Sequence, residues 1–286
     1  MPPAASIIVP CYNCRETICE TIDSVLAQTF TDWECILVSD DNTSYLDFLA
    51  GQGISDQRLI EHPERSYATG TVAPRNRGFS LVRGDFVADL DADDRWKPTR
   101  LERLLPFAEQ HGCVQDILEC FNGSGVMGYS GAPDESGCLL DVAAVLTFDF
   151  PFHLVVRRDR AGACWSAHNS WVPDVVRTML LAAKNPVYRL NEPLLEYRVL
   201  STSMSQSLSG AQRIDEDYGA ILEQLNTGNG FGLTGSDLKA ALQGFRRKQV
   251  LNRRYMADVE GDREPMPFIE WVLVNGCSGH ANRTFA

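Results

Sequence analysis

The sequence predicts an α/β fold in which a mostly parallel sheet carries helices on both faces, followed by a helical C-terminal extension. Short apolar or β-branched runs alternate with segments whose apolar residues recur at helical spacing, as in Rossmann-like folds. From about residue 208 this alternation gives way to charged helical segments. The 286 residues, 44% of them hydrophobic, are enough for one large buried core.

Strands are expected where apolar residues run together, at 6–10, 33–38, 58–61, 85–90, 153–157 and 194–199. Helices are expected where apolar residues recur every three or four positions, at 15–28, 73–83, 97–108, 174–184, 210–225 and 236–256. Residues 112–150 are less periodic, and Gly and Ser are dense at 122–137. We therefore expect a hairpin or mobile loop at 122–137.

Composition excludes several classes of protein. The net charge of −12 opposes non-specific nucleic-acid binding, which needs a basic surface. Nine irregularly spaced cysteines do not form a disulfide framework, and the lone pair Cys11 and Cys14 lacks the partners of a zinc site, so buried thiols are expected. No run approaches the ~20 apolar residues of a membrane span, and the N-terminus shows no signal-peptide pattern. A cytoplasmic location is expected.

Two predicted strands end directly in acidic turns. Residues 33–38 lead into Asp40, and residues 85–90 lead into Asp91, Asp93 and Asp94. Because carboxyl ends of parallel strands share one edge of a sheet, both turns should face the same site. Clustered carboxylates repel each other unless a cation joins them, and oxygen ligands suit Mg²⁺ or Mn²⁺. The alternatives are a solvated turn that caps the next helix and, for Asp40, a helix N-cap.

Several segments resemble the family 2 glycosyltransferases of the GT-A fold. The match runs in order from residue 6 to residue 205 through SIIVPCYN, SVLAQTFTDWECILVSDDNTS, PRNRG, GDFVADLDADDRWKPTRLE, NEPLLEYRV and SMS. The resemblance implies a GT-A domain over residues 1–207, with a donor half at about 1–110 and an acceptor half at about 111–207. Residues 208–286 would form the helical extension.

The resemblance also implies a role for individual residues. The nucleotide would be contacted by Pro10, Tyr12, Asn13, Asp40, Arg75 and Asp91. Asp93, helped by Asp91, would hold Mn²⁺ or Mg²⁺ on the diphosphate, and Asp94 would touch the donor or acceptor sugar.

Asp174 is the expected general base, because inverting members of this family place a carboxylate at the start of the corresponding helix. A helix N-cap is the alternative. Many members have Glu just before the base, where this chain has Pro173. Many also have His where this chain has Leu200, so weak metal binding is expected.

Other side chains are candidates for the acceptor side. His153 and His168 lie in the acceptor half, and Trp171 offers a ring that can stack on a sugar, although a Trp is more often packed in a core. The basic run at 246–254, followed by Phe268 and Trp271, fits either contact with an anionic membrane or, as we favour, a helix face and a segment packed on the domain.

The sequence thus predicts an inverting, metal-dependent glycosyltransferase that uses a UDP-sugar rather than a GDP- or dTDP-sugar. Its acceptor would be a saccharide, a lipid-linked sugar or a small molecule, with nucleic acid least expected. One alternative is a nucleotidyltransferase, although PCYNCRE lacks the glycines of a phosphate loop. The other is a non-catalytic relative that binds nucleotide sugars, which Pro173 and Leu200 keep open.

Overall fold

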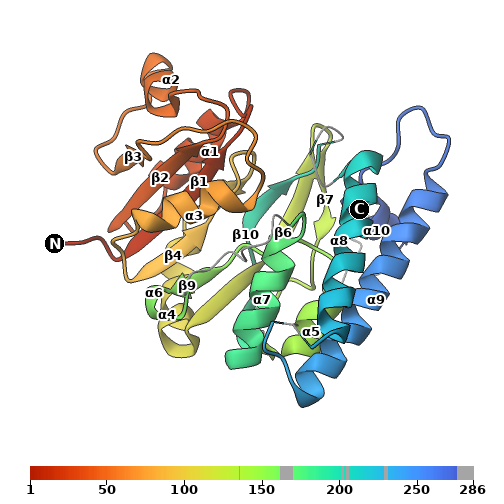
Figure 1. Ribbon diagram of the computed structural model, residues 1–286. Helices are drawn as coiled ribbons and strands as arrows, with labels where there is room; N and C mark the ends of the chain where they lie inside the picture. The colour runs from red at the N-terminus through yellow and green to blue at the C-terminus, as the bar shows by residue number, and fades with distance from the viewer. Residues whose placement is uncertain (135, 162–169, 201–202, 204–205, 229–230, 276–286) are drawn as a thin grey trace.

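One sheet organises the fold in this computed structural model, which describes residues 1–286 except 135, 162–169, 201–202, 204–205, 229–230 and 276–286 (Figure 1). Its main path within the described residues is β3-β2-β1-β4-β9-β6-β10-β5, with β7 paired to β6 and β8 to β10. The strands are β1 (Ala5–Cys11), β2 (Trp33–Ser39), β3 (Leu59–Glu61), β4 (Phe86–Asp89), β5 (Arg95–Trp96), β6 (Cys113–Asn122), β7 (Gly125–Tyr129), β8 (Gly137–Leu140), β9 (Val155–Arg157) and β10 (Val187–Arg198).

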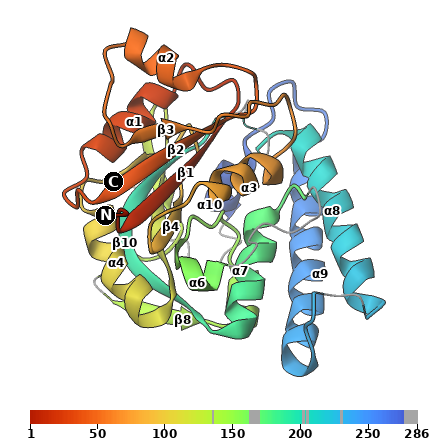
Figure 2. The same ribbon diagram turned by 60° about the vertical axis from the view of Figure 1, so that its left-hand side comes forward.

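The N-terminal half is the parallel, layered unit that the sequence predicts. Strands β3, β2, β1 and β4 run parallel, and β1 and β2 are buried along almost their whole length because helices cover both faces. Helices α1 (Ile18–Leu26) and α4 (Arg100–His111) lie on one face, and α3 (Val72–Ser80) and α7 (Pro173–Lys184) lie on the other (Figures 1 and 2). The short helix α2 (Tyr45–Gly51) connects β2 to β3.

The sequence-based interpretation missed one central strand. Strand β6 pairs with β10 and β9 in the middle of the sheet, within the stretch where no regular strand is predicted. Its apolar pattern is interrupted by the buried Asp116 and Glu119, whose partners Arg100 and Lys97 come from the preceding segment. The expected hairpin follows directly, where β6 turns into β7.

The C-terminal helices pack against the sheet domain. Helices α8 (Leu208–Asn226) and α9 (Gly235–Asp258) lie side by side beyond α7 and α5 (Val142–Thr147), and the short α10 is Phe268–Asn275 (Figure 1). Trp271 is buried against Tyr255 and Phe268. Helix α10 also contacts β7, and the Ile269 amide donates to Gln206 Oε1 (2.8 Å), so the interpretation of this apolar segment as packed on the domain is confirmed. Among the described residues, no helix combines the length and apolar character needed to cross a bilayer.

Gly78 lets α3 approach the sheet closely. A Cβ at this position would lie 2.6 Å from Ile8 Cγ2 and 3.0 Å from Val38 Cγ2. We expect Gly78→Ala to lower the free energy of unfolding by about 1–3 kcal/mol, because overpacking outweighs the roughly 1 kcal/mol gain in helix propensity. Urea unfolding measures this difference. The exposed Gly51, with nothing near its Cβ position, is the matched control, and equal stability changes at both sites would contradict the packing argument.

Candidate active site

Helix α3 joins the two acidic turns at one rim of the sheet. Arg75 of this helix forms an ion pair with Asp91, which follows β4. Nη2 of Arg77 lies 3.4 Å from Oδ1 of Asp40, which follows β2. Because β2 and β4 flank β1 in parallel, their carboxyl ends open on the same edge. The expected convergence of the two turns is therefore confirmed.

Asp40 is buried beneath the segment 66–69. Its carboxylate accepts hydrogen bonds from Ser66 Oγ (2.5 Å), Thr69 Oγ1 (2.6 Å) and the Thr69 amide (2.8 Å). The alternative interpretation of Asp40 as a helix N-cap is wrong, because Ser44 caps α2. A direct contact between Asp40 and a nucleotide stays a prediction.

Two exposed tyrosines meet at this end of the rim. Tyr12 lies in the turn after β1, and its ring is T-shaped to that of Tyr67 with 6.3 Å between centroids. Sequence reasoning identified Tyr12 and missed Tyr67, because the loop that carries Tyr67 has no recognisable spacing. Next to Tyr12, the Asn13 amide donates to Asp41 Oδ2 (2.8 Å), which holds the turn after β1 against the turn after β2.

The carboxylates of the second acidic turn have different environments. Burial by itself would raise the pKa of Asp91, but the Arg75 guanidinium and the charge of His153 together outweigh it, and the pKa is lowered. Burial, together with the charge of Asp91, raises the pKa of Asp93 to about 6. Asp94 is fully buried, and its Oδ1 accepts from the Arg198 amide (2.8 Å). The turn does not cap the next helix, because the N-cap of α4 is Thr99.

A histidine joins this turn from a distant part of the chain. One ligand atom each of Asp91, Asp94 and His153 lie within 4.8 Å of one another, whereas Asp93 is not in this group. Two carboxylate oxygens and one imidazole nitrogen fit a divalent metal ion. Sequence reasoning expected the metal at Asp93 and Asp91 and placed His153 only in the acceptor half, since nothing local links it to the acidic turn.

Asp174 lies in the first turn of α7, and the N-cap is Val172, so its interpretation as an N-cap is wrong. Its Oδ2 accepts from the Phe152 amide (2.9 Å), directly before His153. Burial raises the pKa of Asp174, although the charges of His153 and Arg75 oppose that rise. Asp174 is thus within electrostatic reach of the same groups that surround Asp91.

Comparison with known proteins shows which family has the motifs of this rim. Residues 6–140 match the family model described as Glycosyl transferase family 2, and they include both acidic turns and α3. These residues form a glycosyltransferase family 2 domain.

Named relatives of this glycosyltransferase domain are bacterial proteins. The chain is 29% identical over 216 residues to TuaG of Bacillus subtilis (strain 168), a glycosyltransferase provisionally assigned to teichuronic acid biosynthesis, covering 72% of this chain and 82% of TuaG. It is 32% identical over 163 residues to WfgD of Escherichia coli, a UDP-Glc:alpha-D-GlcNAc-diphosphoundecaprenol beta-1,3-glucosyltransferase, covering 51% of this chain and 64% of WfgD.

The fold agrees with the family. The crystal structure of S. aureus TarS 1–349 in complex with UDP-GlcNAc superposes with a TM-score of 0.67 at 17% identity, covering 85% of this chain and 72% of that one. The α/β class with a mostly parallel sheet and helices at the C-terminus, of GT-A type, is therefore confirmed.

The expected acceptor residues of this glycosyltransferase are only partly described. His168 lies outside the described residues. The Trp171 amide donates to the Asp217 carboxylate, and Arg213 lies 4.7 Å from the Trp171 ring centroid, so this Trp packs against α8. Its contact with an acceptor stays a prediction.

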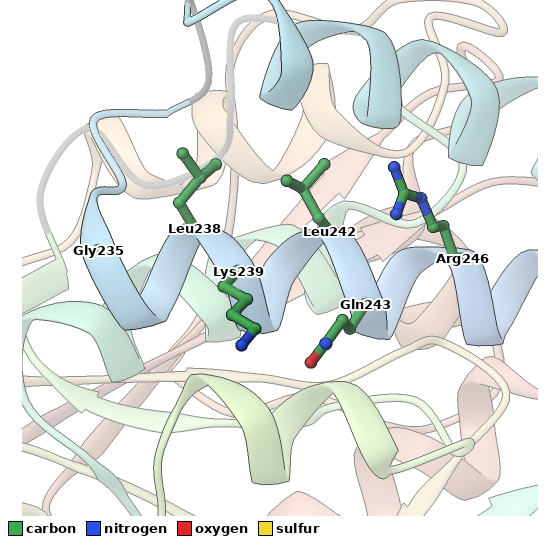
Figure 3. Close-up of a pocket in the computed structure, with 6 residues that line it drawn as sticks. All are labelled: Gly235, Leu238, Lys239, Leu242, Gln243 and Arg246. Atoms are coloured by element: carbon green, nitrogen blue, oxygen red, sulfur yellow. The ribbon is translucent and has the colours of Figure 1, made fainter.

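A separate depression of about 360 Å³ lies on α9 (Figure 3). Its lining residues are Gly235, Leu238, Lys239, Leu242, Gln243 and Arg246. This set contains no carboxylate and no histidine, so the depression offers none of the chemistry of the acidic rim.

Proposed function

We propose that this chain is an inverting glycosyltransferase that transfers a sugar from a UDP-sugar to a hydroxyl group of a lipid-linked saccharide. One group of side chains carries the proposal. At the rim where the parallel strands of a family 2 domain end, the structure brings together Arg75, Asp91, His153 and Asp174. The nucleotidyltransferase alternative does not account for the family match.

The nucleotide end of the donor would lie along the turn Pro10–Asn13, with the base against the Tyr12 ring. Tyr12 is about half exposed at the rim and so is available for stacking. Arg75 bridges towards Asp91 and would face the phosphates. UDP is favoured as the nucleotide because the similar TarS structure holds UDP-GlcNAc and WfgD is named for UDP-Glc.

A divalent cation would be held by the acidic turn and the donor phosphates. The ligand types present there, carboxylates and an imidazole, fit such an ion. When bound, the ion would neutralise charge that develops on the diphosphate as it leaves. We propose Mn²⁺ or Mg²⁺.

Asp174 would act as the general base. Its carboxylate would accept the proton of the acceptor hydroxyl while that oxygen attacks the anomeric carbon. The new glycosidic C–O bond forms as the bond between the anomeric carbon and the phosphate oxygen breaks, and the bond electrons leave with the nucleoside diphosphate. One displacement of this kind inverts the anomeric centre. The raised pKa of Asp174 makes it a stronger base than an exposed carboxylate.

The acceptor assignment follows from the relatives. WfgD is named for a diphosphoundecaprenol acceptor, and a lipid-linked acceptor would place the protein at the cytoplasmic surface of the membrane. Peripheral contact would then fall to the C-terminal extension. Most of its basic run is engaged, since Arg247 and Lys248 bind Asp149 and Arg253 binds Asp215. Contact would therefore rest on exposed cations of α9 such as Lys239 and Arg246.

The nucleotide assignment predicts a specific thermal-shift pattern. UDP, UDP-Glc and UDP-GlcNAc with Mn²⁺ should raise the melting temperature, and GDP-mannose should not, because a ligand at 100 times its Kd stabilises the folded state by about 2.7 kcal/mol. Release of UDP in the presence of GlcNAc-diphosphoundecaprenol then tests transfer. The absence of any response to the uridine nucleotides would overturn the donor assignment. Binding without UDP release would support a non-catalytic relative.

A further inference from the structure

Two cysteines enclose the turn that carries Tyr12. Cys11 is the last residue of β1, and Cys14 follows three positions later in the sequence. The backbone bends between them, with Asn13 in the left-handed region at a φ of 50°. The bend brings the two thiols into hydrogen-bond contact with each other, and both are free. Two cysteines whose sulfurs already touch can be joined by a disulfide with only a small backbone movement.

Metal binding does not account for this pair. In the part of the chain that the structure describes, the groups of three or more potential metal ligands include neither Cys11 nor Cys14. A structural zinc ion takes four ligands, and two thiols alone do not complete such a site. The chemistry that the pair offers is therefore that of a dithiol.

The two sulfurs have different environments. Cys11 is fully buried, its Sγ lies 3.3 Å from the Val9 carbonyl oxygen to which it donates, and burial raises its pKa. Cys14 is 8% exposed, beside the half-exposed Tyr12. Hydrogen bonds from the Cys11 thiol and the Tyr45 hydroxyl lower the pKa of Cys14, although burial opposes them. Because the thiolate is the form that attacks an oxidant, Cys14 is suited to attack first and Cys11 to close the bond.

We infer that Cys11 and Cys14 are a redox-active dithiol, which hydrogen peroxide converts to an internal disulfide. The Cys14 thiolate attacks one peroxide oxygen as the O–O bond breaks, which gives a sulfenic acid and a hydroxide that takes up a proton to become water. The Cys11 thiol then attacks the Cys14 sulfur. The S–S bond forms, the S–O bond breaks, and the hydroxyl leaves with the Cys11 proton as a second water. One peroxide is thus reduced to two waters while two thiols are oxidised to one disulfide.

The disulfide would act on the donor site, a consequence that rests on the proposed function, in which the nucleotide lies along this turn. The Asp41 carboxylate holds the turn, because it accepts from the Asn13 amide (2.8 Å) and the Tyr45 hydroxyl (2.7 Å). The Cys14 amide donates to the same hydroxyl (3.3 Å). Drawing the sulfurs together to the roughly 2.05 Å of an S–S bond moves the turn against these bonds. The oxidised protein should therefore bind UDP about fivefold or more weakly than the reduced protein.

Mass spectrometry of the whole chain after treatment with hydrogen peroxide, with the remaining free thiols blocked, tests the inference. We expect a peptide linked between Cys11 and Cys14 that has lost two hydrogens and that dithiothreitol restores. The UDP affinity should fall on oxidation and return on reduction. In Cys11→Ser, Cys14 should stop as a sulfenic acid that dimedone traps.

Cys19→Ser is the matched control. Cys19 is less buried than Cys14, but burial and the charge of Asp23 raise its pKa. If thiol contact and thiolate character decide reactivity, Cys19→Ser should form the same disulfide at the wild-type rate.

A wild-type protein whose two thiols stay free in peroxide, or one that is oxidised only at other cysteines, would overturn the dithiol, and this measurement needs no variant to fold. An unchanged UDP affinity after complete disulfide formation would overturn the link to the donor site. The proposed function fails separately: a reversible disulfide in a protein that binds no UDP when reduced would retain the dithiol and reject the donor assignment. Turnover of a UDP-sugar by a protein whose thiol pair resists peroxide would do the reverse.

Discussion

Asp174→Asn is expected to lower the rate of sugar transfer by about 10²- to 10⁴-fold, the usual contribution of a general base. The amide has the shape of the carboxylate and can still accept from the Phe152 amide, so the fold should be kept. The Kd for UDP should change by less than about twofold, because Asp174 would touch the acceptor and not the nucleotide. Single-turnover transfer from the preferred donor measures the rate, and thermal shift measures UDP binding.

Asp237→Asn is the matched control, because Asp237 is also a carboxylate in the first turn of a helix, α9, at a distance from the rim. It should transfer sugar at the wild-type rate. A wild-type rate in Asp174→Asn would show that another group takes the proton.

The same carboxylate should set the pH dependence of transfer. Burial raises the pKa of Asp174, and only the ionised form accepts a proton. As the pH falls through this raised value, the rate should be lost, at a pH above the ordinary Asp pKa of about 3.9. A pH–rate profile measures this acid limb. If the transfer rates of the wild type and of Asp174→Glu both declined only at or below about pH 4, this result would contradict a buried base.

Arg100→Leu is expected to lower the free energy of unfolding by about 3–5 kcal/mol. Arg100 and Asp116 are both 0% exposed, with Nη2 and Oδ1 2.8 Å apart. Removal of the guanidinium leaves a buried carboxylate without its counter-ion, which is more destabilising than the loss of one contact. Because Arg100 also holds the His153 carbonyl, Mn²⁺ binding should weaken in the same variant.

The double variant Arg100→Leu with Asp116→Leu should recover much of this loss, since no uncompensated charge remains. Arg253→Leu, which removes an exposed partner of Asp215, should change stability by less than about 1 kcal/mol. Urea unfolding gives all three values. If Arg100→Leu lowered the free energy of unfolding by less than about 1 kcal/mol, the buried pair would not be what stabilises β6 in the sheet.

Local patterns in the sequence were sufficient for the frame of the molecule. The apolar runs of β1 and β2, the helical spacing of α7, and the acidic turns at the ends of β2 and β4 depend on neighbouring residues alone, because backbone geometry sets their periodicity. The ordered motifs around Asp40, Asp91 and Arg75 led to the glycosyltransferase family, which the family model confirms over residues 6–140.

Only the tertiary structure decided which side chains meet. His153 reaches Asp94 because β9 lies beside β4 in antiparallel pairing, and no local pattern encodes that neighbour. Strand β6 carries Asp116 into the core because Arg100 neutralises it there, so a charge that argues against a buried strand in the sequence is compatible with one in the fold. Tyr67 faces Tyr12 because Asp40 and a backbone bridge from Asp41 hold the loop that carries it. Short-range residue order thus determined the elements and the chemistry available, whereas long-range strand pairing decided how that chemistry is assembled.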